Sequence, residues 1–335
     1  MKCENPVIYK LKGYKVNGKM DLKFLGHMSD FVLNGYDKHF DDPVWCKLNN
    51  YVVIPCGRCI CCRLNYSKQW ADRLILASEN IKYKYFLTLT YDDVAIEETK
   101  VKMYNDDDEL IEGFSLVKDH VQRFMKRLRK YAIENNKIDG KNIQYYLAGE
   151  YGDLNYRPHY HVILFNFIID DLEKEYSKNG YNYFQSKVID NLWTYGRTQV
   201  CEVTYETCAY VAGYVTKKVY GEKAVKFYSD RAIVPEFCTM SRRPAIGRDL
   251  YDKQKFEIYR NDSLLLKRGD RVFEIKPCRY YDKLFDIENH TKMNDVKLAR
   301  SFHRSYKHTD KYGFSYLQTC AKNIKARQKI KKGEL

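Results

Sequence analysis

Two apolar runs separated by a short polar turn constrain the fold of this chain most strongly. Residues 143–149 and 159–165 have the composition of buried strands, and Glu150 and Arg157-Pro158 lie in the segment between them. So short a connection joins antiparallel strands, because a parallel pair needs a crossover of about a dozen residues or more. From residue 65 to 240 the predicted order is α-β-α-β-β-α-β-α. We therefore expect an α+β fold, a central antiparallel sheet of about five strands with helices covering one face.

Hydrophobic periodicity places the other elements of this core. The expected elements are helices at 67–81, 115–135, 184–193 and 205–219, and strands at 85–91 and 197–203. Composition divides the chain into three parts. These are a cysteine-rich segment at 1–65, a central domain at 66–240 and a basic region at 241–335 that is mostly helical or irregular.

Cysteine spacing predicts a metal site near the N-terminus. The chain has 11 cysteines, an odd number, and no apolar export signal, so a disulfide framework is not expected. Cys56, Cys59 and Cys62 are each separated by two residues, and Gly57 permits a tight turn after the first of them. Three thiolates at this spacing can converge on one structural Zn²⁺. An iron–sulfur cluster and free buried thiols are the alternatives.

The spacing leaves two ligand choices open. A fourth ligand must come from upstream, where Cys3 and Cys46 are the candidates and Cys3 is preferred. Cys61 stands next to Cys62 and can exchange with it as the third ligand.

A second candidate metal site lies in the second apolar run. His159 and His161 are one residue apart in a strand, so both imidazoles lie on the same face, which Ile163 and Phe165 continue. The antiparallel turn brings the carboxylate of Glu150 within reach of them. Two imidazoles and one carboxylate leave open positions on a divalent cation such as Mg²⁺ or Mn²⁺. The alternative is a pair of core or surface histidines.

Two tyrosines and a lysine follow at helical spacing. Tyr210, Tyr214 and Lys217 form one narrow stripe if residues 205–219 are helical, and the apolar residues of this segment centre on another face. Both tyrosines should therefore point away from the core that the helix buries. A neutral tyrosine, with a pKa of about 10, is a poor nucleophile. A cation that polarises a phosphate and a lysine that stabilises negative charge make its attack on phosphorus feasible. Packing aromatics are the alternative.

The charge distribution indicates a polyanionic partner. The net charge is +14, and residues 242–335 hold 24 basic and 12 acidic side chains, whereas residues 1–241 hold 34 and 32. Nucleic acid is the first candidate, an anionic membrane surface the second, and a solubilising tail the alternative. The basic residues singled out near the C-terminus are Lys322, Lys325, Arg327, Lys329, Lys331 and Lys332. The candidate DNA contacts elsewhere are Arg123, Lys126, Arg127, Arg157 and Lys218.

Several classes of protein are excluded. No window approaches 18 uninterrupted apolar residues, so no membrane span is expected. The absence of a secretory signal predicts a cytoplasmic protein. Residues 13–20 have the spacing of a phosphate-binding loop, but Met20 stands where the Mg²⁺-binding Ser or Thr belongs. We therefore expect no nucleotide cofactor.

Together these motifs resemble the HUH endonuclease superfamily. Within it the chain is similar to the replication initiators of small single-stranded-DNA phages, the Microviridae, and most of all to the gokushovirus branch. The similar segments are Met1-x-Cys3, Pro55-Cys56-Gly57-x-Cys59-x-x-Cys62, the strand 86–90, Gly149-Glu150-Tyr151-Gly152, Arg157-Pro158-His159-Tyr160-His161, Tyr210-x-x-x-Tyr214-x-x-Lys217 and Ser241-Arg242-Arg243-Pro244-x-Ile246-Gly247. The resemblance runs from residue 1 to about residue 250.

The resemblance implies a rolling-circle initiator with the HUH endonuclease palm. Such a protein nicks one strand of origin DNA, stays bound to the 5′ end, leaves a 3′-hydroxyl for the host polymerase and finally rejoins the displaced strand. It acts on single-stranded DNA in the cytoplasm of the bacterial host. Three other functions are the alternatives. These are a zinc-containing protein that binds single-stranded nucleic acid without catalysis, a plasmid relaxase, and a transposase of the same superfamily.

Overall fold

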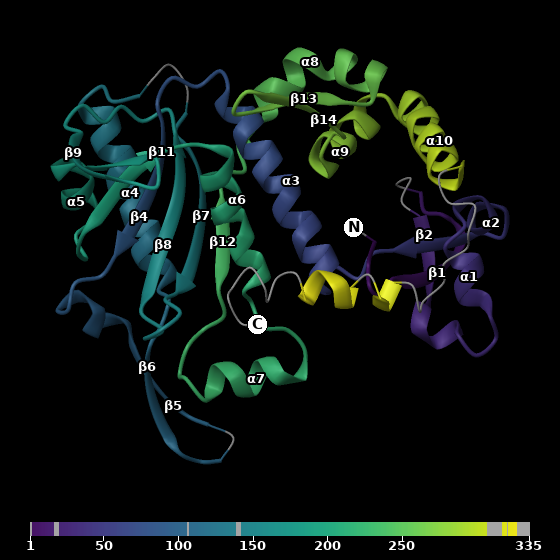
Figure 1. Ribbon diagram of the computed structural model, residues 1–335, viewed down its shortest axis with the longest axis horizontal. Coiled ribbons are helices and arrows are strands. Elements are labelled where there is room, and N and C mark those ends of the chain that lie inside the picture. Colours follow the sequence, from purple (N-terminus) through teal and green to yellow (C-terminus); the bar gives the residue numbers. More distant parts are fainter. Residues whose placement is uncertain are drawn as a thin grey trace. The chain divides into compact units, whose positions relative to one another are not determined.

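A computed structural model describes residues 2–16, 20–105, 107–138, 142–306, 317–319 and 321–326 (Figure 1). The chain forms two compact units. The sheet unit comprises Ser67–Lys255 and Leu265–Ile275, and the terminal unit comprises Met1–Tyr66, Phe256–Leu264 and Lys276–Leu335. Two groups of residues singled out above lie outside the described residues. The first is Asn17–Lys19 in the segment with phosphate-loop spacing, and the second is Arg327, Lys329, Lys331 and Lys332 near the C-terminus.

A seven-stranded antiparallel sheet forms the centre of the sheet unit, in the order β12-β7-β8-β4-β11-β10-β9. Its strands are β4 (Lys84–Thr90), β7 (Gln144–Tyr151), β8 (Pro158–Phe165), β9 (Glu173–Lys178), β10 (Tyr181–Gln185), β11 (Thr198–Glu202) and β12 (Phe237–Met240). The α+β class and the antiparallel hairpin β7–β8 are confirmed. The expected number of about five strands was too low. β9 is polar and exposed along its whole length, and β12 has only four residues, too few to show an alternating pattern.

Helices cover both faces of this sheet, not one as expected (Figure 1). On one face α4 (Lys118–Glu134) and α5 (Lys187–Trp193) pack against Leu147 and Val162. On the other face α3 (Ile60–Ser78) and α6 (Tyr205–Gly213) pack against Phe86 and Ile163. The reason is visible in β8, where every residue from Tyr160 to Phe165 is buried. A strand that is apolar on both sides needs cover on both sides.

Three predicted helix boundaries were wrong. α3 begins at Ile60, so Ser67 lies inside the helix and is buried. The run expected as a helix from Phe184 continues β10 through Gln185, and Ser186 then caps α5 by accepting a hydrogen bond from the backbone N–H of Ile189.

The helix expected over 205–219 ends early. α6 stops at Gly213, and a 3₁₀ turn, η3, spans Tyr214–Thr216. Glycine weakens a helix, and the Thr216 hydroxyl donates to the Gly213 carbonyl at 2.7 Å, a local bond that competes with helical pairing. Tyr210 therefore lies in α6, whereas Tyr214 is the first residue of the 3₁₀ turn.

The terminal unit has a small sheet and a separate core. Its three-stranded sheet has the order β2-β1-β3, with β1 (Val7–Tyr14), β2 (Met20–His27) and β3 (Tyr51–Ile54). Its core contains Ile8, Met28, Phe40, Cys46 and Leu317. The helices of this unit include α1 (Tyr36–Phe40), α2 (Pro43–Leu48), α9 (Arg279–Glu288) and α10 (His290–Tyr306).

The remaining elements are short or join the units. They are η1 (Met28–Phe31), η2 (Ala95–Thr99), the hairpin β5 (Lys100–Tyr104) with β6 (Leu110–Phe114), α7 (Glu222–Ser229), α8 (Arg248–Asn261), and the hairpin β13 (Leu264–Arg268) with β14 (Arg271–Ile275). Among the described residues, no helix is both long enough and apolar enough to cross a membrane.

Candidate active site and cysteine cluster

The histidine pair and Glu150 meet on the face of the sheet that α6 covers. The antiparallel register of β7 and β8 sets Glu150 directly opposite His159. The Glu150 Oε1 atom lies 2.8 Å from His159 Nε2 and 3.1 Å from His161 Nε2. One ligand atom from each residue lies within 4.8 Å of the others, so the three side chains could hold one metal ion.

The site keeps these groups in the forms that bind a cation. Burial alone would raise the pKa of Glu150, but hydrogen bonds with His159 and His161 hold that pKa well below its ordinary value. Burial lowers the pKa of His161, although Glu150 opposes this shift. An ionised carboxylate beside a neutral imidazole is a suitable donor set for a divalent cation.

Lys217 completes the charge balance of the site. Its Nζ atom lies 3.0 Å from Glu150 Oε2 and 3.3 Å from Asp153 Oδ1. Burial would lower the pKa of Lys217, but the contact with Glu150 outweighs burial and raises that pKa. The side chain is therefore an ammonium ion, placed beside the candidate metal ligands.

Both candidate tyrosines contact His161, but their exposure differs. The Tyr214 ring stacks on the imidazole of His161 at a centroid distance of 5.2 Å, and the Tyr210 ring meets it edge-on at 5.1 Å. Tyr210 is 51% exposed and Tyr214 is 3% exposed. Burial raises the pKa of both hydroxyls, and the negative charge of Glu150 adds to the shift.

The expectation that both tyrosines point away from the core holds for Tyr210 and is wrong for Tyr214. Tyr214 belongs to the same buried cluster as Val211 and Phe86. Gly213 and Tyr214 keep right-handed helical dihedrals, so Tyr214 stays close to the stripe that holds Tyr210. The sheet face that carries His161 then covers the ring.

Known proteins that resemble this chain are phage replication proteins. The family model for replication-associated protein ORF2 matches residues 84–219. The chain is 34% identical to replication-associated protein ORF2 of Spiroplasma virus 4 over 295 residues, which are 86% of this chain and 81% of that protein. The chain therefore belongs to the phage replication-associated proteins.

Two further relatives agree with this assignment. Replication-associated protein VP4 of Bdellovibrio phage phiMH2K is 31% identical over 65% of this chain and 64% of its own length. Replication-associated protein ORF4 of Chlamydia phage 1 is 31% identical over 59% of this chain and 44% of its own length. No solved structure gives a significant match. The resemblance to phage replication initiators drawn from the motifs is confirmed, and the family match over 84–219 includes β4, the histidine pair, both tyrosines and Lys217.

The basic residues of this replication-associated protein divide between two locations. Arg157 lies in the turn before His159 and donates hydrogen bonds to the Tyr91 carbonyl and the Asp93 carboxylate. The ammonium of Lys218, one residue after Lys217, lies over the ring of Tyr220.

The other three candidate DNA contacts lie on α4, which covers the face opposite the histidine pair. Arg123 pairs with Asp119, and Lys126 is exposed. Arg127 donates to the carbonyl oxygens of Leu192 and Trp193 at the end of α5. The structure therefore does not bring these three cations to the candidate metal site.

The sequence motifs gave no role to the residues that contact His161 from the neighbouring strand. Thr88 lies opposite His161 in the pairing of β4 with β8, and its Oγ1 atom is 3.1 Å from His161 Nδ1. Phe86 stacks on His161 at a centroid distance of 5.4 Å. Strand 86–90 was recognised as a motif, but its register against β8 could not be read from the sequence.

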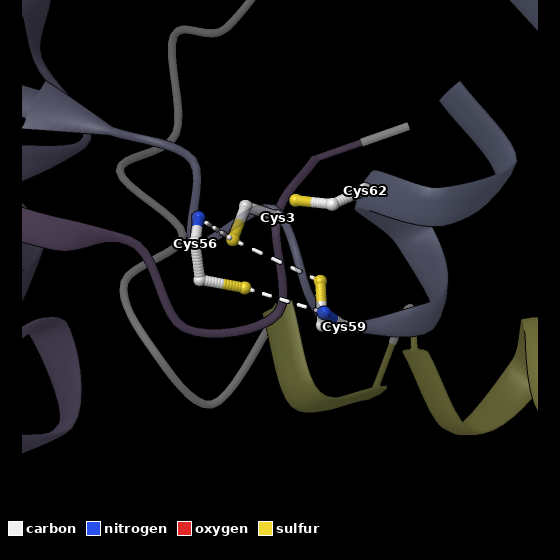
Figure 2. A group of neighbouring side chains, drawn as sticks. All are labelled: Cys3, Cys56, Cys59 and Cys62. Carbon is white, nitrogen blue, oxygen red and sulfur yellow. Dashed lines mark hydrogen bonds between the residues drawn. The ribbon is translucent and has the colours of Figure 1, made fainter. Parts of the chain in front are cut away.

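A second cluster of candidate ligands lies in the terminal unit of the replication-associated protein (Figure 2). The sulfur atoms of Cys3, Cys56, Cys59 and Cys62 all lie within 4.8 Å of one another. Backbone N–H groups donate to three of the sulfurs, from Cys56 to Cys3, from Cys59 to Cys56 and from Glu4 to Cys59. Hydrogen bonds donated to sulfur favour the ionised thiolate over the neutral thiol.

Local conformation explains how three of these cysteines converge. Gly57 has a φ of +75°, which a residue with a Cβ rarely adopts, and this turn leads from Cys56 to Cys59. Cys62 follows in the first turn of α3. The hydrogen bond between Cys3 and Cys59 raises the pKa of Cys3 and lowers that of Cys59.

The structure separates the alternatives that the spacing left open. Cys61 is fully buried in an apolar cluster with Ile60 and Ala321. Cys46 lies in the core of the terminal unit, where its thiol donates to the Phe40 carbonyl at 3.6 Å. Neither is among the four clustered sulfurs.

The two donor sets suit different uses of a metal. Four thiols match the full tetrahedral set of a structural zinc site, whereas two imidazoles and one carboxylate leave positions for substrate.

Proposed function

We propose that this replication-associated protein nicks and rejoins single-stranded DNA through a covalent 5′-phosphotyrosine. It would thereby start and end rolling-circle replication of a phage genome in the cytoplasm of the bacterial host. The observation that carries the proposal is the packing of both tyrosine rings against His161, with Lys217 bound to Glu150 beside them. A nucleophile, a cation site and a positive side chain thus lie within one small region.

His159, His161 and Glu150 are the residues that would hold Mg²⁺ or Mn²⁺. When bound there, the cation supplies polarisation of a phosphate oxygen. The buried and ionised carboxylate of Glu150 and the neutral imidazole of His161 fit such a cation. The four cysteines would hold a structural Zn²⁺ in the terminal unit.

The chemical step exchanges one phosphodiester for another. The tyrosine oxygen forms a bond to phosphorus while the bond from phosphorus to the 3′ oxygen breaks. The hydroxyl proton leaves to solvent and the 3′ oxygen takes up a proton. Rejoining is the reverse reaction with a new 3′-hydroxyl. Lys217 stabilises the negative charge that develops at the phosphate.

We assign the first cleavage to Tyr210 because it is 51% exposed, whereas Tyr214 is 3% exposed. Tyr214 must leave its stack on His161 before its hydroxyl reaches a phosphate. Continuous rolling-circle synthesis needs a second cleavage while the first covalent link persists, and Tyr214 supplies that second nucleophile.

DNA and host proteins are the proposed partners. Arg157 and Lys218 lie close in sequence to catalytic residues, so we assign them to single-stranded DNA at the nick. Arg123, Lys126 and Arg127 on α4 would contact origin DNA further from the reaction. A host helicase would unwind the template and a host polymerase would extend the 3′ end, without a nucleotide cofactor on this chain.

Single-stranded oligonucleotides tiled from a cognate genome test the proposal. Incubated with the protein and Mg²⁺, one of them should give an adduct that survives denaturation, and peptide mapping should place the DNA on Tyr210. Tyr210→Phe should move the DNA to Tyr214, and the double Tyr→Phe variant should give no adduct.

The same assay distinguishes the alternative function. A protein that only binds single-stranded nucleic acid would retain these oligonucleotides without forming an adduct, and this result would contradict the proposal. An adduct that never forms on Tyr214, even in Tyr210→Phe, would leave Tyr214 as a positioning residue.

A further inference from the structure

We propose that Thr88 is a positioning residue that allows His161 to carry its proton on Nδ1 and thereby frees the Nε2 atom for a divalent cation. The inference rests on the cation site of the proposed function and adds a residue to it. Thr88 lies on β4, a neighbouring strand of β8, and is not itself one of the three candidate ligands.

The contact is built into the sheet. Thr88 and His161 are direct cross-strand partners, so their side chains stand on the same face. Thr88 Oγ1 lies 3.1 Å from His161 Nδ1, and His161 is 5% exposed. A buried N–H group without an acceptor is costly, so this hydroxyl decides whether Nδ1 can carry the proton.

A neutral imidazole has one N–H, which leaves two arrangements here. In the first, Nδ1–H donates to the Thr88 hydroxyl and Nε2 has a free lone pair for a cation. In the second, Nε2–H donates to Glu150 Oε1, 3.1 Å away, and Nδ1 accepts from Thr88. A hydroxyl both donates and accepts, so Thr88 supports either tautomer and lets a cation select the first.

Removing the hydroxyl would close the site. With valine at position 88, a proton on Nδ1 would be buried without an acceptor, while a proton on Nε2 keeps Glu150 as its partner. The second tautomer would then dominate, and its N–H would occupy the lone-pair position that a cation needs. Cation binding would have to move this proton first, so the affinity would fall.

His159 shows the contrast. Its Nδ1 lies 3.2 Å from the carbonyl oxygen of Arg157, an acceptor that no side-chain substitution removes. Glu150 Oε1 lies 2.8 Å from Nε2 of the same ring, so two acceptors compete for its one proton, and neither acceptor depends on Thr88. A change at Thr88 therefore acts on one imidazole of the pair and leaves the other as a reference within the same protein.

The test compares Thr88→Val with Thr88→Ser in the full chain. Thr90→Val is the matched control, because Thr90 lies on the same face of β4 and its hydroxyl donates to the Arg197 carbonyl. Two readouts are used. The ¹⁵N chemical shifts of the His161 ring report the tautomer, and the electron paramagnetic resonance signal of free Mn²⁺ reports the affinity.

We expect Thr88→Val to restrict His161 to the tautomer protonated on Nε2 and to weaken Mn²⁺ binding by about 10- to 100-fold, the usual effect of removing a partner of a metal-bound histidine. Thr88→Ser and Thr90→Val should bind Mn²⁺ within about threefold of the wild-type protein. If the wild-type protein binds Mn²⁺ and Thr88→Val binds it equally well, the proposed role of Thr88 is wrong and the cation site stands. A wild-type protein that binds no Mn²⁺ would overturn the cation site as well.

Discussion

The cysteine cluster and the histidine site both gather candidate metal ligands, but they differ in what surrounds the ligands. Four sulfurs enclose the first position, and backbone N–H groups donate to three of them. At the second, three ligands lie beside a lysine and a half-exposed tyrosine. A filled donor set stabilises a fold, whereas an incomplete set next to reactive side chains can act on a substrate.

The two candidate sites also differ in the partners that their ligands have within the protein. Glu150 retains Lys217 as a counter-charge at 3.0 Å, so its ionised form is balanced by the protein itself. At the cysteine cluster, the thiols of Cys3 and Cys59 share a hydrogen bond, and backbone N–H groups donate to Cys3, Cys56 and Cys59. Their thiols must lose protons to bind a metal, so binding there is coupled to folding of the segment that supplies them.

The largest expected effect is therefore on the cysteine cluster. Cys59→Ala removes one of the four proposed zinc ligands, and structural zinc contributes about 10–16 kcal/mol in small zinc domains. We expect loss of zinc and loss of hydrogen-exchange protection over β3 and the start of α3. Protection of β7 and β8 should remain. Elemental analysis and exchange mass spectrometry measure both.

Cys61→Ala is the matched control for that substitution. Cys61 is buried beside the cluster but is not one of the clustered sulfurs. Its replacement should retain one zinc per chain and reduce the free energy of unfolding by about 1 kcal/mol. Equal zinc loss in both variants, or zinc retained in Cys59→Ala, would contradict the assignment of ligands.

The second-largest expected effect is a loss of activity in a protein that keeps its fold. His161→Gln removes a candidate ligand but fills part of the space where Phe86 and Tyr214 stack. His161→Ala would leave a cavity and confuse folding with catalysis. We expect His161→Gln to keep its zinc and its melting temperature within a few degrees, while the rate of adduct formation falls by more than about 100-fold. Adduct formation at the wild-type rate would refute the ligand role of His161.

The smallest effect concerns the basic C-terminal stretch, which belongs to neither site. Leu317 and Ala321 pack into the terminal unit and Lys325 pairs with Glu4, so the change must begin after these residues. Replacing Arg327, Lys329, Lys331 and Lys332 by glutamine should reduce the slope of log affinity against log salt by up to about 3.6 on duplex DNA. Exchanging arginine and lysine at these positions should leave the slope unchanged. An unchanged slope in the glutamine variant would show that the stretch does not bind DNA.

The sequence predicted the local parts of both sites better than their surroundings. The short turn between β7 and β8 fixed their pairing, so the approach of Glu150 to the histidines followed from chain connectivity. The spacing around Gly57 likewise predicted the convergence of three cysteines. The choice of Cys62 over Cys61 depended on an apolar cluster that includes Ala321, which no local pattern reveals.

Other features depend on long-range packing and could not be read from the chain. The ring of Tyr214 is buried because it stacks on His161 of the sheet, a partner that the periodicity of its own segment does not reveal. The cations of α4 lie away from the histidines because α4 covers the opposite face of the sheet. Helical periodicity identifies the apolar face of a helix, but it does not show which side of a sheet the helix will cover.

Adduct formation as a function of metal content tests the difference between the two sites most directly. A carboxylate chelator of modest strength should remove Mg²⁺ and leave one zinc per chain. The treated protein should keep its fold, form no covalent adduct with the cognate oligonucleotide, and recover full adduct formation when Mg²⁺ or Mn²⁺ is added. Adduct formation that persists in the chelator, or that returns only when zinc is added, would contradict an account in which the cysteines stabilise the fold and the histidine site carries the reaction.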